Sequence, residues 1–118
     1  MSAANDGPAI IQAKRWYWQR ISAMVLALCV LVHLAVLIYA VRGGLSAAGI
    51  LGRTQGNWAF GTFYALFVFA CAVHVPVGLG SILREWCGIG AAAALYLARG
   101  FGLLILMMGL RAVWAVVG

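Results

Sequence analysis

The chain has very little charge, and above all very little negative charge. Only 2 of its 118 residues are Asp or Glu against 8 Lys or Arg, so 8% are charged, about a third of the usual fraction. Hydrophobic residues make up 66% of the chain and the mean hydropathy is +1.05. A soluble domain with this composition would lack the polar surface to cover its core, which excludes a water-soluble enzyme. The basic residues are scattered between apolar stretches, and this excludes an electrostatic nucleic-acid binder.

Motifs for hydrolysis or phosphoryl transfer are also missing. The sequence has no paired carboxylates, no glycine-rich phosphate loop and no internal repeat. Its cysteines Cys29, Cys71 and Cys87 form no Cys-x-x-Cys motif and no Cys/His metal spacing. Two of them lie inside apolar segments, so we interpret the three as small packing residues.

Long uncharged segments separate the charges. There are 21 residues between Arg20 and Arg42 and 30 between Arg53 and Arg84, and each exceeds the ~20 residues with which a helix crosses ~30 Å of hydrocarbon. A third apolar segment follows Glu85. The sequence therefore predicts an all-α membrane protein with transmembrane helices at about 18–41, 58–83 and 93–116. They form one domain, 16–118, after a tail at 1–15 whose first part, Met1 to Ala13, is expected to be flexible.

The basic residues predict the orientation of these helices. Five of them flank the start of the first span and the connection from the second to the third, namely Lys14, Arg15, Arg20, Arg84 and Arg99. The positive-inside rule then places the N-terminus in the cytoplasm and the C-terminus outside. We interpret Arg99, at the expected cytoplasmic start of the third helix, as fixing topology, and Arg111 as snorkelling towards the outer surface. A short surface helix is expected within Leu45 to Leu51.

Two histidines interrupt the apolar spans. His33 lies in the first span and His74 in the second, and an ionisable side chain at such depth usually marks a function. A neutral imidazole can present Nε2 to haem iron, or it can form a hydrogen bond between helices. Residue counting places both at mid-membrane, with a difference in depth of only ~5 Å. By this count the two can serve one haem or two.

Small residues distinguish the surroundings of His74. Cys71, Gly78 and Ser81 lie on its face of the helix, where they would leave room for a flat macrocycle. Pro76 removes one intrahelical hydrogen bond beside the histidine. On the first helix, Ser22 shares a face with His33.

These residues resemble a known family. Trp16-Tyr-Trp-Gln-Arg20-Ile-Ser22-Ala heads the first helix, and His74-Val-Pro-Val-Gly78 in the second is followed by Ile-Leu-Arg84-Glu85-Trp86. The combination resembles the cytochrome b membrane-anchor subunits of succinate dehydrogenase and fumarate reductase. The resemblance covers roughly residues 16–86.

The resemblance implies a role in electron transport from succinate to quinone. Such anchors attach a flavoprotein and an iron–sulfur subunit, which hold FAD and the Fe–S clusters, to the cytoplasmic face of the inner membrane. His74 would be an axial ligand of haem b, usually paired with a histidine of a second anchor chain. Arg20 would contact the quinone and the haem propionates, with Ser22 close by. The dicarboxylate chemistry would belong to the partner subunits.

Two features depart from the family pattern. Trp16 stands where single-haem members commonly have a quinone-contacting serine, and His33 has no counterpart in many of them. Because two-haem members place ligands on both helices, His33 is either a second haem ligand or a structural hydrogen-bonding residue. The alternative functions are a cytochrome b subunit of another redox complex and a cofactor-free transporter or assembly protein. The direction of the succinate–fumarate reaction, the quinone and the identity of the second anchor chain stay open.

Overall fold

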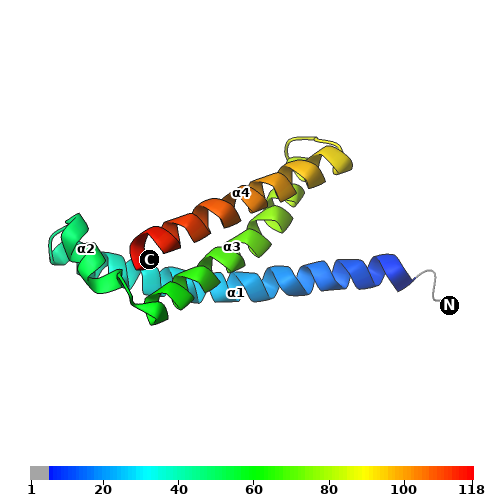
Figure 1. Ribbon diagram of the computed structural model, residues 1–118. Coiled ribbons are helices and arrows are strands. Elements are labelled where there is room, and N and C mark those ends of the chain that lie inside the picture. The colour runs from blue at the N-terminus through cyan, green and yellow to red at the C-terminus, as the bar shows by residue number, and fades with distance from the viewer. Residues whose placement is uncertain (1–5) are drawn as a thin grey trace.

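The computed structural model describes residues 6–118, and all regular structure in this part is helical (Figure 1). The helices are α1 (Asp6–Arg42), α2 (Ala47–Thr54), α3 (Trp58–Glu85) and α4 (Ala91–Val117). Three of them, over Gly7–Arg42, Trp58–Glu85 and Ala91–Val117, are long and apolar enough to cross a membrane. The predicted all-α fold with three membrane-spanning helices is thereby confirmed.

The first helix starts earlier than the sequence indicated. Residues 6–13, expected to belong to a flexible tail, form the first turns of α1; residues 1–5 lie outside the described part. Pro8 suits this position because proline has no backbone N–H, and the N–H groups of the first helical turn have no acceptor within the helix. The helix therefore extends well beyond the apolar span that begins near Trp18.

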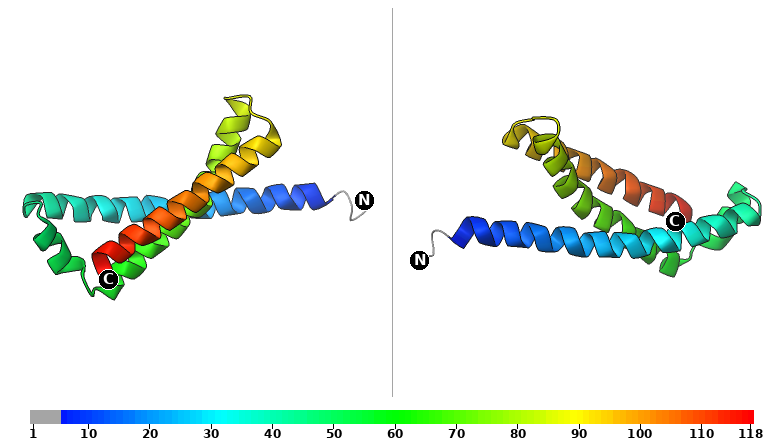
Figure 2. Two further views of the ribbon diagram at one scale, coloured as in Figure 1. Left: turned by 45° about the horizontal axis from the view of Figure 1, so that its top comes forward. Right: turned by 180° about the vertical axis from the view of Figure 1, so that it is seen from behind.

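The third and fourth helices form an antiparallel hairpin, and α1 packs mainly against α3. Figure 2 shows the two hairpin helices side by side in both views, while α1 diverges from them towards its own N-terminus. Gly88, with φ +66°, allows the tight reversal between α3 and α4. Residues of α1 line cavities together with α3 and α4 at this end of the molecule.

A glycine sets the close approach within the hairpin. A Cβ at Gly102 on α4 would fall on the ring of Pro76 and lie 3.3 Å from the carbonyl oxygen of Ala72. Pro76 has no N–H to donate to that carbonyl oxygen, so the hydrogen bond that residue 76 would make in a regular helix is absent. Here the kink-prone turn of α3 is covered directly by the backbone of α4.

At the opposite end, short capped segments close the bundle. The side chain of Ser46 accepts a hydrogen bond from the Gly49 amide and caps α2, as Asn57 does for α3 through the Phe60 amide. The buried Thr54 hydroxyl lies 2.7 Å from the carbonyl oxygen of Val116, which ties α2 to the end of α4. The short helix expected within Leu45 to Leu51 is present, shifted towards the C-terminus.

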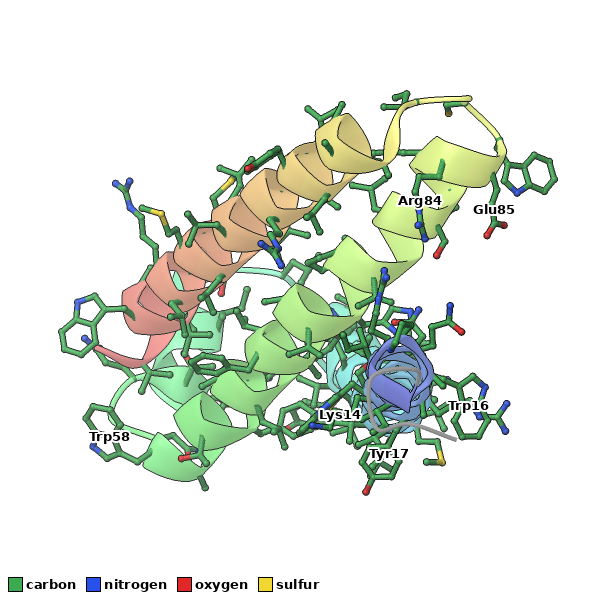
Figure 3. All side chains as sticks on the ribbon, turned by 90° about the vertical axis from the view of Figure 1, so that its right-hand side faces the viewer. Lys14, Trp16, Tyr17, Trp58, Arg84 and Glu85 are labelled. Carbon is green, nitrogen blue, oxygen red and sulfur yellow. The ribbon has the colours of Figure 1, made fainter. Side chains whose placement is uncertain are left out.

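Large apolar side chains remain exposed along the three long helices, including Trp16, Leu31, Leu66, Leu103 and Met108. Figure 3 shows Trp58 at one end of the hairpin and Arg84 and Glu85 at the other. An apolar lateral surface between polar ends is what a lipid bilayer requires. The chain is a multi-pass membrane protein.

Candidate functional site

The two halves of the sequence motif meet across α1 and α3. Ser22, which is 5% exposed, lies with its Oγ atom 3.3 Å from Nδ1 of His74. Helix α1 therefore packs against α3 through the serine and the histidine that the sequence singled out.

A second hydrogen bond of Ser22 favours one tautomer of the neutral imidazole. The hydroxyl donates to the carbonyl oxygen of Gln19, one turn earlier, at 3.1 Å. A serine hydroxyl has one proton to donate but two acceptor lone pairs, so towards His74 it acts as the acceptor. Neutral His74 then holds its proton on Nδ1, and its Nε2 keeps a free lone pair. That tautomer is the one a metal ligand needs, with the other ring nitrogen held by a second group.

The other histidine has different neighbours. Nδ1 of His33 lies 2.9 Å from the hydroxyl of Tyr64, and its ring meets those of Tyr64 and Phe67 edge-on at centroid distances of 5.6 and 5.7 Å. A phenol can donate as well as accept. If it donates to Nδ1, the His33 proton lies on Nε2 and blocks metal coordination there. His33 thus sits in an aromatic cluster of α1 and α3 that is sufficient to explain a histidine as an interhelical hydrogen-bonding group.

The two histidines lie at different depths. His33 is opposite Tyr64 and His74 is opposite Ser22. Tyr64 and His74 are ten residues apart on α3, a separation of ~15 Å along the helix axis. The small difference in depth expected from residue counting is therefore wrong, because the count started from charges that do not lie level with each other. His33 and His74 are too far apart to ligate one iron, and the described residues contain no group of three metal-ligating side chains.

One side chain of α1 contacts the face of α3 that carries the small residues near His74. A Cβ at Gly78 would lie 3.4 Å from the side-chain nitrogen of Gln19, so that glycine admits a side chain of α1. Gln19 therefore lies against Gly78, on the face of α3 where small residues were expected to leave room for a macrocycle. The side-chain oxygen of this glutamine is buried and has no hydrogen-bond partner among the described residues, which leaves an unused acceptor close to Ser22.

A polar cavity opens beyond Gln19, towards the N-terminus of α1. Its volume is about 340 Å³. It is lined by Gln12, Arg15, Trp16, Gln19 and Arg20 of α1 and by Val77, Ser81 and Arg84 of α3. We call it the arginine pocket. Its α3 lining runs from Val77, three residues after His74, to Arg84, ten residues after it, so the pocket extends from ~5 to ~15 Å from the histidine along α3.

Trp16 and Arg20 act together in the wall of this pocket. The Arg20 guanidinium carbon lies 5.1 Å from the centroid of the Trp16 ring, within the range of a cation–π contact. The two residues are one helical turn apart, where side chains meet. The tryptophan that departs from the family pattern thus supports the arginine that matches it. Arg20 itself stays exposed.

The other predicted residues lie elsewhere. Arg99 is not at the start of α4 but eight residues after Ala91, its first residue, because α4 begins at the alanine-rich segment and the arginine does not mark the helix boundary. Arg111 is near the other end of α4 and exposed. Cys29 is buried at 2% exposure, Cys71 is half-buried and Cys87 is exposed, all as free thiols.

Sequence reasoning missed three members of the site. Gln19 was detectable as the residue one turn before Ser22, on the same face. Arg15 belongs to the same helical stripe as Gln12 and Gln19. Tyr64 gave no signal, because its pairing with His33 depends on the register between two helices, which no local pattern encodes.

Comparison with protein-family models, curated proteins and solved structures gave no match to the chain.

Proposed function

We propose that this chain is a haem b-binding membrane-anchor subunit of a succinate:quinone oxidoreductase in a bacterial-type cytoplasmic membrane. It attaches a flavoprotein and an iron–sulfur subunit to the membrane and contributes to the site where quinone exchanges electrons. The observation that carries the proposal is the hydrogen bond between Ser22 and His74. It joins the two segments that resemble this family and leaves Nε2 of His74 free.

The residues fit the cofactor at His74. Its Nδ1–H is held by a hydroxyl that is itself fixed by the Gln19 carbonyl, and such second contacts orient a ligating imidazole. When bound, haem b accepts and donates single electrons. Since His33 lies at another depth, a second axial ligand would come from a second anchor chain. We therefore assign one haem ligand, His74, to this chain and a structural role to His33.

The arginine pocket fits anionic and carbonyl groups. Arg15, Arg20 and Arg84 supply guanidinium groups, and Ser81 and Gln12 supply neutral hydrogen-bonding groups. A guanidinium donates to a quinone carbonyl or pairs with a propionate carboxylate. The contact with Trp16 limits the motion of Arg20, so its donors are presented to the pocket at lower entropic cost. FAD and the iron–sulfur clusters belong to the partner subunits, as does the dicarboxylate reaction.

The experiment is a reduced-minus-oxidised absorption spectrum of the purified complex. We expect a b-type haem signal in the wild type, its loss in His74→Ala and its retention in the matched control His33→Ala. A preparation that is colourless with both histidines intact contradicts the haem proposal. Loss of the signal in His33→Ala with retention in His74→Ala contradicts the assignment of the ligand.

The quinone site is tested separately. An Arg20→Ala variant that keeps its haem should lose most quinone reduction, whereas Arg111→Ala, at the other end of the membrane, should keep it. Equal activity of the two variants contradicts the role of Arg20.

A further inference from the structure

A second hollow lies beside the arginine pocket, lined by residues of α1, α3 and α4; Figure 2 shows α1 diverging from the hairpin at this end. Two cavities of about 500 and 220 Å³ share Arg15, Pro76, Leu95 and Ala98 in their linings. They therefore form one groove between α1, α3 and α4, which we call the three-helix groove. Ile11, Pro76, Leu95, Ala98 and Arg99 line the groove and not the arginine pocket, whereas Arg15, Val77 and Arg84 line both.

The groove has positive charge at its walls and no negative charge. Arg15 from α1, Arg84 from α3 and Arg99 from α4 all line it. Glu85 is the one acidic residue among residues 7–118, and it is absent from both linings. Three guanidinium groups without a lining carboxylate favour an anionic occupant.

The floor of the groove is apolar. Ile11, Pro76, Val77 and Leu95 supply hydrocarbon there. Arg99 lies eight residues into α4, ~12 Å below the start of that helix, whereas Arg84 lies at the very end of α3. The positive charge thus spans the depth from the membrane edge into the apolar region. An occupant must combine an anionic group with hydrocarbon.

We propose that the three-helix groove binds an anionic phospholipid. Its phosphate pairs with Arg15 and Arg84 at the membrane edge, and one acyl chain lies along Val77, Leu95 and Ala98. Arg99 reaches from below towards the same phosphate, as long basic side chains do at membrane interfaces. Each arginine close to an anionic lipid surface strengthens binding about fivefold. The proposal shares Arg15 and Arg84 with the arginine pocket, whereas Arg99, Leu95 and Ala98 line the groove and not that pocket; it does not require the haem.

The test counts lipids bound to the full chain, in its complex, by native mass spectrometry from mixed micelles. Phosphatidylglycerol is compared with phosphatidylcholine, which has the same phosphate and acyl chains but no net charge. We expect phosphatidylglycerol to be retained at least fivefold better by the wild type. Arg99→Gln should reduce this preference about fivefold, and the matched control Arg111→Gln, on the same helix, should leave it unchanged.

A second variant separates a lipid from a free anion. Leu95→Trp keeps every arginine but fills the apolar floor, so it should lower phosphatidylglycerol retention while helicity by circular dichroism stays constant. Equal retention of the two lipids by the wild type overturns the proposal. So does an equal loss in Arg111→Gln, undiminished retention in Leu95→Trp, or displacement of the lipid by excess inorganic phosphate.

Discussion

Ser22 and His74 are 52 positions apart in the sequence, yet Oγ of the serine lies 3.3 Å from Nδ1 of the histidine. The same hydroxyl donates its proton to the Gln19 carbonyl oxygen, so it can only accept from the imidazole. This relationship favours the tautomer of neutral His74 in which Nε2 carries the free lone pair, as the proposed haem ligand requires.

Replacing Ser22 by alanine should therefore weaken haem retention without abolishing it. The variant removes the acceptor for Nδ1–H, and loss of such a second contact typically lowers metal affinity 10- to 100-fold. Haem content per complex and the reduction potential are the measurements. Thr62→Ala is the matched control, since the Thr62 hydroxyl donates to the Trp58 carbonyl on the same helix and lies twelve residues from His74. An Ser22→Ala complex with wild-type haem content and potential would refute the tautomer argument.

Replacing Tyr64 by phenylalanine should affect stability alone. The change keeps the ring contacts with His33 and Phe67 but removes the 2.9 Å hydrogen bond, at a cost of about 1 kcal/mol. Thermal unfolding of the complex should shift slightly downwards while the haem spectrum stays the same. A changed spectrum or haem stoichiometry would instead make His33 a second haem ligand.

The fold could be predicted from the sequence because charge scarcity and segment length decide it. In lipid, a single segment can pair all of its backbone N–H and C=O groups within itself only as a helix. The uncharged segments of 21 and 30 residues therefore predict membrane-spanning helices. The start of α1 was predicted too far along the sequence, because apolar residues indicate the membrane-spanning part of a helix and not its first residue. Pro8 was the usable signal for the earlier start.

The site could be predicted only in part. His74, Ser22 and Arg20 were recognisable as motif residues, but the register between α1 and α3 was not. That register pairs His33 with Tyr64 and places the histidines ~15 Å apart in depth, and it sets Gln19 against Gly78. Such relations depend on how two helices pack, and a pattern along one helix does not contain them.

Substituting alanine for Gly102 should destabilise the hairpin. Its Cβ would collide with the rigid ring of Pro76, and overpacking of this kind costs about 1–3 kcal/mol. Gly100→Ala is the matched control on the same helix, because a Cβ there meets nothing within 4 Å. Resistance to thermal or denaturant unfolding should fall for Gly102→Ala only, and equal stability of the two variants would contradict the close packing of α4 on Pro76.

The orientation of the chain can be tested with its own cysteines. Cys87 is exposed in the connection after α3, whereas Cys29 is buried. A membrane-impermeant maleimide should label Cys87 in inside-out vesicles and not in right-side-out vesicles, because the positive-inside rule places this connection in the cytoplasm. Cys87→Ser should abolish the signal. Labelling of Cys87 from the outer side would reverse the proposed topology.

The most direct test of the central claim is the absorption change on adding succinate to the isolated wild-type complex. The account predicts that a b-type haem band appears with succinate, and that it is lost in His74→Ala while the flavoprotein and iron–sulfur subunits still oxidise succinate with a soluble acceptor. A complex that shows no b-type band even with a strong chemical reductant would contradict it.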